Sequence, residues 1–529
     1  MRFSVLTLLP ALGLLSLSTA APSTDATAVC NEIFSSIPER TAFDPDGPTP
    51  ERSSDLESIY DETIDTYWDA ENKGDRPACI LFPSSAEDVS IAVKALKERP
   101  SVPFAIKSGG HQFNRGFSST DGGVLISFRP NLASISLSED GETAEVGPGA
   151  RWQEASEALD SSNKCVVGGR IGNVGVGGYT LGGGLSFLTA QHGFASDNVV
   201  NYEAVLADGS IVNANETSNT DLYWALRGGG SIFAVVTMFT LKTHDIGDIW
   251  GGQMVFTVDK LTEVSAAITN FVANNDDPKA AVIPTFMMIG PVNLINLFTI
   301  FFFYDGPEPP AHVFADFDAI LPFIKNVKTQ RYPELTDLPA ASSDAGQSTA
   351  NGVNSFPNMD AGNMTEFLEW HWNQANEAAI KRSVSRFDIQ LFTMAIQPIP
   401  ASMQKVAAAK GPSPLAMDHR NGDKIWIEYN IGWLNPDCSE DCPKAVKDLL
   451  DEARSYQVDN YAGVPPTNYE SGDLSYVPYN PLFMNDAQGT QDVLKSYGSD
   501  NYQRLKSIHQ TLDPDGFFTT RQQCFGFSD

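Results

Sequence analysis

The sequence predicts an α+β protein with more than one structural unit. A chain of 529 residues exceeds one ordinary domain and can bury large cores. Its first half alternates short apolar strands with helical segments around glycine-rich turns. After Trp250, longer strands alternate with helices, a pattern typical of an antiparallel sheet covered by helices on one face. With 42% hydrophobic and 19% charged residues, the chain is globular rather than disordered.

Apolar periodicity predicts the elements of the first half. A capping box at Ser84–Glu87 starts a helix that carries Val89, Val93 and Leu96 on one face. Turn residues predict two hairpins, at 134–146 and at 200–214. The other predicted helices are 55–68, 152–159 and 220–228, and the other strands are 78–82, 103–107, 123–128, 165–167 and 233–243.

The second half contains the longest strands. The apolar run 294–304 is too short to span a membrane and is interpreted as a buried strand. The small residues of 342–356 predict a loop, and 475–481 leads back towards the first half. Further strands are predicted at 252–258, 282–288, 387–398 and 424–433, and helices at 262–273 and 501–512.

Two glycine-rich stretches carry most of the functional information. Lys107–His111 places an imidazole directly after a glycine turn, and Gly168–Gly184 holds nine glycines in seventeen positions. Such glycine is retained where a backbone turns sharply or touches a flat or anionic ligand. Neither stretch ends in the Gly-Lys-Ser/Thr of a Walker loop or fits Gly-x-Gly-x-x-Gly. The remaining interpretation is a dinucleotide-binding cradle of a type different from these two motifs.

These stretches resemble the flavin-binding half of the vanillyl-alcohol oxidase superfamily, and within it the berberine bridge enzyme group of FAD-linked oxidases. The resemblance continues through 197–199, 206–209, 221–230 and 233–237, and it returns in 497–505, 513–518 and at Gln522. It implies a two-part FAD-binding domain of the p-cresol methylhydroxylase type with an inserted substrate domain. The expected boundaries are a lead-in at 21–74, FAD-binding parts at 75–247 and 479–523, and a substrate domain at 248–478.

The resemblance implies FAD bonded through its 8α-methyl to His111. Position 171, where relatives with two covalent links have Cys, is Ile, so one link is expected. Ser231–Ala234 departs from the family's usual Asn and following Gly, which puts adenine contacts there in doubt. The residues expected along the cofactor are Ser108, Gly109, Gly110, Val174, Gly175, Gly177, Gly178, Gly182, Gly183, Gly193, Asn198, Val236 and Asn485.

Three side chains are candidates for the catalytic base. Glu428 alternates with Trp426 and Asn430 on one strand face, where a desolvated carboxylate would have a raised pKa. The alternative is that this face is solvated. Asp486 follows Asn485 where the family often has Tyr, although it is equally read as an ordinary loop aspartate. Tyr179 is the third candidate.

The implied activity is hydride transfer from a small alcohol, amine or phenolic molecule to FAD, with reoxidation by oxygen to peroxide. In the family, Val at the position of Val174 accompanies oxidases. The alternatives are an oligosaccharide oxidase and a secreted flavin-binding protein with little turnover. A hydrolase is disfavoured, since no Gly-x-Ser-x-Gly elbow occurs.

The remaining features predict an exported protein. Met1–Ala20 has the pattern of a signal peptide, and Asn215 and Asn363 head glycosylation sequons. A formal charge of −31 argues against nucleic acid and anionic membranes as partners. Disulfides are expected between Cys30 and Cys79 and between Cys438 and Cys442, which leaves Cys165 and Cys524. The scattered histidines and single close Cys pair do not predict a metal site.

Overall fold

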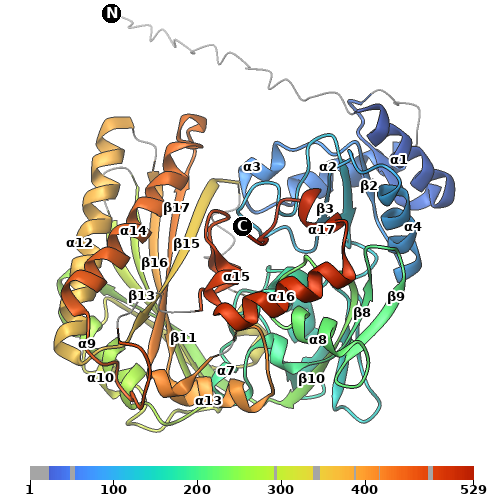
Figure 1. The fold of residues 1–529 in the computed structure, drawn as a ribbon. Coiled ribbons are helices and arrows are strands. Elements are labelled where there is room, and N and C mark those ends of the chain that lie inside the picture. Colours follow the sequence, from blue (N-terminus) through green and yellow to red (C-terminus); the bar gives the residue numbers. More distant parts are fainter. Residues whose placement is uncertain are drawn as a thin grey trace, which may run out of the picture.

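The computed structural model describes residues 23–47, 54–290, 295–337, 346–386, 389–415, 417–474 and 481–528. The expected signal peptide lies outside these residues. Within them, no helix is both long and apolar enough to cross a membrane. The architecture is α+β, as predicted, with two sheets in the first half and one large sheet in the second (Figure 1).

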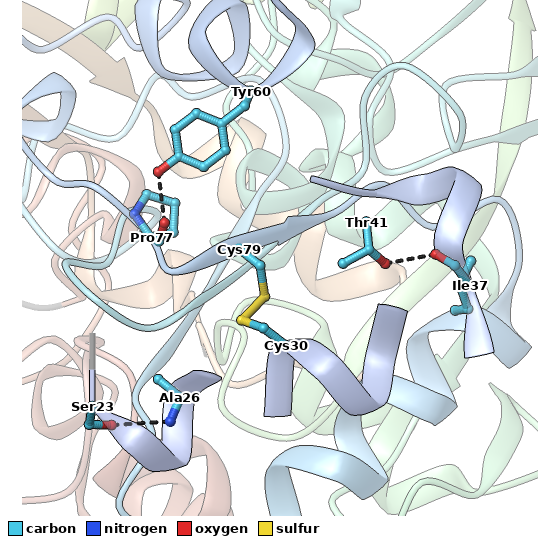
Figure 2. Close-up of a disulfide and its surroundings, with 8 residues drawn as sticks. All are labelled: Ser23, Ala26, Cys30, Ile37, Thr41, Tyr60, Pro77 and Cys79. Atoms are coloured by element: carbon cyan, nitrogen blue, oxygen red, sulfur yellow. Dashed lines mark hydrogen bonds between the residues drawn. A yellow bond between two sulfur atoms is a disulfide. The ribbon is translucent and has the colours of Figure 1, made fainter. Parts of the chain in front are cut away.

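The first sheet has the strand order β1-β2-β4-β3. Its strands are β1 (Thr41–Phe43), β2 (Cys79–Leu81), β3 (Phe104–Lys107) and β4 (Val124–Ser127), with helices α1 (Thr24–Ser36), α2 (Ser54–Asp65), α3 (Ala70–Lys73) and α4 (Ala86–Lys97) around it. Because β3 ends at Lys107, the first glycine turn begins at the carboxyl end of a strand. The Cys30–Cys79 disulfide joins α1 to β2, which confirms the predicted pairing (Figure 2).

The second sheet follows the order β5-β6-β10-β8-β9, with β7 paired to β10. Both predicted hairpins form, with β5 against β6 and β8 against β9. The strands are β5 (Ile135–Leu137), β6 (Thr143–Val146), β7 (Lys164–Val166), β8 (Val199–Val205), β9 (Ile211–Asn215) and β10 (Val235–Asp245). The helices are α5 (Trp152–Asp160), α6 (Val176–Leu181), α7 (Thr189–His192) and α8 (Thr220–Leu226).

The second half is a seven-stranded antiparallel sheet in the order β14-β11-β13-β12-β16-β17-β15. Its strands are β11 (Ile249–Thr257), β12 (Ala280–Ile289), β13 (Ile295–Tyr304), β14 (Ile324–Gln330), β15 (Ser348–Pro357), β16 (Ile389–Ile399) and β17 (Lys424–Trp433). Helices α9 (Leu261–Asn274), α12 (Ala361–Arg386) and α14 (Asp441–Tyr461) cover one face and share its core (Figure 1). The opposite face is turned towards the first half of the chain.

Alternation along β17 decides which side chains point to which side. Ile425, Ile427 and Tyr429 belong to the core under the helices, whereas Trp426 belongs to the core of the first half. Trp426 is fully buried and stacks on Phe483 with ring centroids 4.8 Å apart. On this face, Trp426 is therefore not solvated, whereas Glu428 and Asn430 are half-buried.

Strand β15 corrects the predicted loop at 342–356. Residues 342–345 lie outside the described part of the chain, but Ser348–Pro357 pairs with β17 along its whole length. The small residues that favoured a loop are required by packing. A Cβ at Gly352 would come within 2.6 Å of Leu450 and 2.9 Å of Val446 on α14.

The C-terminal segment returns to the first half, as the resemblance implies. Helices α15 (Val493–Ser496), α16 (Ser499–Leu512) and α17 (Phe517–Thr520) lie beside the first two sheets (Figure 1). After them, the Arg521 guanidinium donates hydrogen bonds to the carbonyls of Leu96 and Val102. The predicted Cys438–Cys442 disulfide also forms, and Cys165 and Cys524 are free thiols in the described chain.

Candidate active site

The two glycine stretches touch each other through their backbones. A Cβ at Gly109 would lie 2.5 Å from the nitrogen of Gly175, and one at Gly175 would lie 2.3 Å from the nitrogen of Gly109. Ser108 stands between the stretches, since its Oγ donates to the Pro148 carbonyl and accepts from the Gly177 N–H. Only glycine permits this approach, so the two motifs form one cradle.

The second stretch is fixed from its other side by residues at the start of α5 and just before it. The Trp152 N–H donates to the Val174 carbonyl at 3.1 Å, and the Val176 N–H donates to the Ala150 carbonyl at 2.9 Å. Val174 itself is half-buried. Gly178 is exposed, and an added Cβ there would meet nothing within 4 Å. This part of the cradle therefore has room for a flat ligand.

His111 follows Gly110, whose φ of +73° makes the turn. Its ring stacks on Trp68, with centroids 4.4 Å apart and an interplanar angle of 19°. The Nε2 atom is buried and has no hydrogen-bond partner among the described residues. Burial lowers the pKa of His111 to about 4, against smaller opposing effects from its backbone and Asn173. The imidazole is thus neutral at pH 7, with a nitrogen lone pair available for bonding.

Asn485 closes the cradle from the C-terminal segment. Its Nδ2 donates to the Tyr179 carbonyl at 3.2 Å, and its Oδ1 accepts from the Gly184 N–H at 3.2 Å. A Cβ at Gly182 would lie 2.6 Å from this amide, so the glycine run makes space for it. Gly183 has a φ of +108° in the same turn.

Three expected cofactor residues lie deeper in the fold. Gly193 turns with a φ of +82° before Asn198. Asn198 donates both amide hydrogens, to the carbonyls of His192 and Phe194, and its Oδ1 contacts His244 Nε2. Val236 is buried in β10. The Asn198 side chain is therefore fully used in folding its turn.

Two half-buried carboxyl groups form a cluster, one on the face of β17 that is turned towards the first half of the chain and one in the C-terminal segment. Glu428 is half-buried, and its Oε1 accepts a hydrogen bond of 2.6 Å from Asn351 Nδ2 on β15. Asn351 in turn accepts from Asn430, two residues along β17. The second carboxylate is Asp486, whose Oδ2 is buried and has no hydrogen-bond partner in the described chain.

Arg170 supplies the positive charge of this cluster. It lies within the second glycine stretch, and its Nη1 donates to Gln397 Oε1 on β16. Burial raises the pKa of Glu428 to about 7, while Arg170 and the Asn351 hydrogen bond oppose that shift. Burial and then the negative charge of Glu428 raise the pKa of Asp486 well above its usual range, again opposed by Arg170. Two buried carboxyl groups beside one cation favour keeping one proton between them.

Tyr179 has a different environment. Its hydroxyl donates to the Leu185 carbonyl, and its ring packs edge-on against Trp152 with centroids 5.5 Å apart. Burial raises its pKa above the ordinary value. Both features favour a packing role.

A cavity of about 240 Å³ lies beside Arg170 of this cluster. Arg170 and Gln397 line it together with apolar side chains such as Phe187, Ile283 and Met403, and it extends to the exposed Asp276. Within the described residues, no group of three or more His, Cys, Asp or Glu side chains is placed to hold a metal.

Sequence reasoning missed Arg170, Gln397, Asn351 and Trp68. Arg170 is the only charged residue within the second glycine stretch, and Gln397 is a polar residue in an apolar strand. Both of these unusual placements are visible in the sequence and could have identified the two residues. Asn351 was hidden because its strand was interpreted as a loop.

Residues 77–215 match the FAD binding domain family. An FAD-linked oxidoreductase of Arthroderma benhamiae is 36% identical over 468 residues, which cover 87% of this chain and 89% of that protein. This chain belongs to the FAD-linked oxidoreductases. The FAD-dependent monooxygenase FUP4 of Fusarium proliferatum is 32% identical, with 85% of each chain covered.

Solved structures place this FAD-linked oxidoreductase in the berberine bridge enzyme-like fold. 6-Hydroxy-D-nicotine oxidase of Arthrobacter nicotinovorans superimposes with a TM-score of 0.69 at 20% identity, covering 92% of this chain and 97% of that one. Berberine bridge enzyme gives 0.68 at 18% identity, covering 94% and 100%. The resemblance drawn from the motifs is confirmed at the level of fold and family.

The residues present fit FAD. The contact of Gly109 with Gly175 leaves a cradle of close backbone, and His111 Nε2 and Arg151 Nε are buried polar atoms without partners among the described residues. Lys107 is buried beside Arg151 and Arg129, which together with burial lower its pKa to about 7. Unpartnered donors and clustered cations suit a ligand that carries a pyrophosphate.

Proposed function

We propose that this FAD-linked oxidoreductase is an oxidase that removes a proton from a small alcohol, amine or phenol with Glu428. The observation that carries the proposal is the hydrogen bond of Glu428 with Asn351 within the electrostatic influence of Arg170, a residue that also lines the cavity. A carboxylate with a pKa near 7 is half ionised at neutral pH, which suits a general base. When bound, FAD supplies the acceptor for the hydride that leaves the substrate carbon.

The chain's own groups have separate tasks in this proposal. Asn351 orients the Glu428 carboxylate through its 2.6 Å hydrogen bond. Arg170 stabilises the ionised form of that carboxylate. Asp486, whose pKa burial and the charge of Glu428 raise well above its usual range, holds the proton of the pair in this proposal and so is not available to accept another. The apolar wall around Phe187 excludes water from the proton transfer.

The same proposal includes one covalent link to FAD, through His111. Its neutral, partly buried nitrogen supports this. Ile171 occupies the position that would carry a second link, and Cys165 belongs to a separate core cluster with Phe187 and Phe303. Burial raises the pKa of the Cys165 thiol, which makes it a poor nucleophile.

The choice of a small organic substrate rests on relatives. One is a bifunctional solanapyrone synthase of Alternaria solani, 32% identical over 84% of this chain and 80% of that one. Val174 supports oxygen as electron acceptor and peroxide as product. Secretion is supported by the Met1–Ala20 pattern and the two disulfides.

The test starts with peroxide release over a panel of aromatic alcohols, amines, phenols and oligosaccharides. With the best substrate, Glu428→Gln should slow anaerobic flavin reduction by roughly 10²-fold or more, the usual contribution of a positioned base. Asp486→Asn should be milder, and Tyr179→Phe should reduce at the normal rate. Collapse in Asp486→Asn with normal reduction in Glu428→Gln would reverse the roles.

The names of several relatives make monooxygenation the second candidate. Mass spectrometry of products formed under ¹⁸O₂ separates the two. An oxidase leaves both labelled oxygens in hydrogen peroxide, whereas a monooxygenase places one labelled oxygen in the product and the other in water. Label in the organic product would replace the oxidase proposal.

A further inference from the structure

Trp68 lies in a segment that connects both halves of the molecule beside His111. The segment runs from the end of α2 to the start of α3, and its indole is half-buried. It faces the His111 ring nearly in parallel at 4.4 Å, which makes it the aromatic neighbour of that imidazole. Neither the motifs nor the catalytic cluster explain this contact.

The backbone of Trp68 is held on both sides. Its N–H donates to the carbonyl of Gly110 at 2.9 Å, so the segment is tied to the turn that carries His111. Its carbonyl accepts from the Gly346 N–H at 3.1 Å, and the Ala70 N–H donates to the Gln347 carbonyl at 2.9 Å. The backbone from which the indole projects is therefore tied both to the turn of His111 and to the approach to β15.

Asp69 strengthens this connection. It is fully buried, and its Oδ2 accepts from the backbone N–H of Thr349 at 2.6 Å and from the Thr349 hydroxyl at 3.1 Å. Its Oδ1 accepts from the N–H groups of Glu71 and Asn72, which caps α3. A buried carboxylate with these partners fixes the strand β15, the helix α3 and the intervening Trp68 in one arrangement.

We infer that Trp68 is a positioning residue for the attachment of FAD to His111, and that the Asp69–Thr349 contact holds it in place. The inference rests on the proposed covalent link. The indole covers one face of the imidazole and restricts the rotation of the ring. Trp68 itself reacts with nothing.

The formation of the bond between His111 and FAD determines which atoms must be positioned. The His111 nitrogen lone pair would form the new bond to C8α, while that carbon and the imidazole N–H would each give up one proton. FAD would take up the two electrons released, and dioxygen would accept these two electrons and two protons to leave as hydrogen peroxide. The step needs an in-plane approach of the nitrogen lone pair, and misplacement by about 1 Å can cost roughly 10²-fold.

The test measures the rate of covalent attachment in the full chain. Protein is produced in riboflavin-limited cells and incubated aerobically with FAD, and flavin that survives acid precipitation is followed with time. Trp68→Leu keeps apolar bulk but loses the stacking face, and it should attach flavin about tenfold more slowly or worse. Trp68→Phe should restore most of the rate. Trp370→Leu is the matched control, because Trp370 stacks on Tyr456 at 3.8 Å within the helical layer.

Total bound flavin, covalent and released, separates positioning from folding. It should stay at the wild-type level in Trp68→Leu, because the cradle contact of Gly109 with Gly175 is intact. Attachment at the wild-type rate in Trp68→Leu overturns the inference. Equal slowing in Trp68→Leu and in Trp370→Leu overturns it as well.

Asp69→Asn tests the same inference if Trp68→Leu does not fold. The substitution puts an amide N–H against the Thr349 N–H while leaving the indole in the chain, and it should also slow attachment. Normal attachment in that variant overturns the inference. Wild-type protein that binds FAD but never retains it through acid precipitation contradicts the proposed link itself, an outcome distinct from all of these.

Discussion

Gly175→Ala is the substitution that tests the cradle most directly. The added Cβ would lie 2.3 Å from the Gly109 nitrogen and 2.4 Å from Ser108 Oγ. Ordinary contacts begin about 1 Å further away, so the two backbones must separate. Overpacking of this kind costs about 1–3 kcal/mol, and each hydrogen bond lost, such as Gly177 N–H to Ser108, adds about 1 kcal/mol.

A cost of about 2–4 kcal/mol corresponds to roughly 30-fold to 10³-fold weaker flavin binding. The assay is the ratio of flavin absorbance to protein absorbance in purified protein, with thermal unfolding measured in parallel. Gly175→Ala should lose flavin and unfold at a lower temperature. Gly247→Ala is the control, because Gly247 is exposed and has free space around its Cβ position. A normal flavin ratio in Gly175→Ala would refute the cradle.

Gly178→Ala completes the comparison within the same stretch. Its added Cβ meets no protein atom within 4 Å, and α6 is a helix, so the fold should be as stable as the wild type or more so. Flavin binding should nevertheless be weaker, since the resemblance implies that the cofactor lies against this residue. Unchanged flavin binding in Gly178→Ala would show that the open side of Gly178 faces solvent alone.

Two further predictions concern buried charge. Arg170→Met removes the cation that favours ionised Glu428, so the rise of the flavin reduction rate with pH should move to higher pH; an unmoved profile in stopped-flow measurements would contradict this role. Burial lowers the pKa of His371 to about 4. The buried neutral imidazole therefore contributes fully to the free energy of unfolding above about pH 6.5, and this contribution is lost as pH falls towards 4. Chemical denaturation should show a loss of unfolding free energy of up to about 3 kcal/mol over this pH range in the wild type and a smaller loss in His371→Gln. Equal losses in the two proteins would refute this role of His371.

Much of the fold follows from periodicity in the sequence. The strand that carries Glu428 alternates apolar and polar residues, and alternation alone indicated that Trp426 and Glu428 share a face. Most of the predicted strand 294–304 forms β13 (Ile295–Tyr304), because Phe298, Ile300 and Phe302 fill the core under the helices. The glycine motifs located the cradle because the close approach of Gly109 to Gly175 demands glycine.

The failures have a common physical origin in contacts between distant segments. The interpretation of 342–356 as a loop missed β15, since its small residues are selected by α14 and not by strand propensity. The role of Asn351 was lost with that strand. Likewise, nothing local shows that Arg170 reaches Gln397, 227 residues further along the chain.

The catalytic cluster explains why the chain is interrupted by a large inserted sheet. Glu428 comes from that sheet, Arg170 from the second glycine stretch and Asp486 from the returning C-terminal segment, so none of the three parts holds the cluster alone. An isolated Arg170 in the cradle would be a buried cation without its carboxylates, and Glu428 would be a surface carboxylate with an ordinary pKa. In the proposed mechanism, assembly of the two halves therefore creates both the proton acceptor and its raised pKa. The Asp69–Thr349 hydrogen bond joins the segment of Trp68 to β15 in the same assembly, so the proposed cofactor attachment and the proposed base both depend on the docking of the two halves.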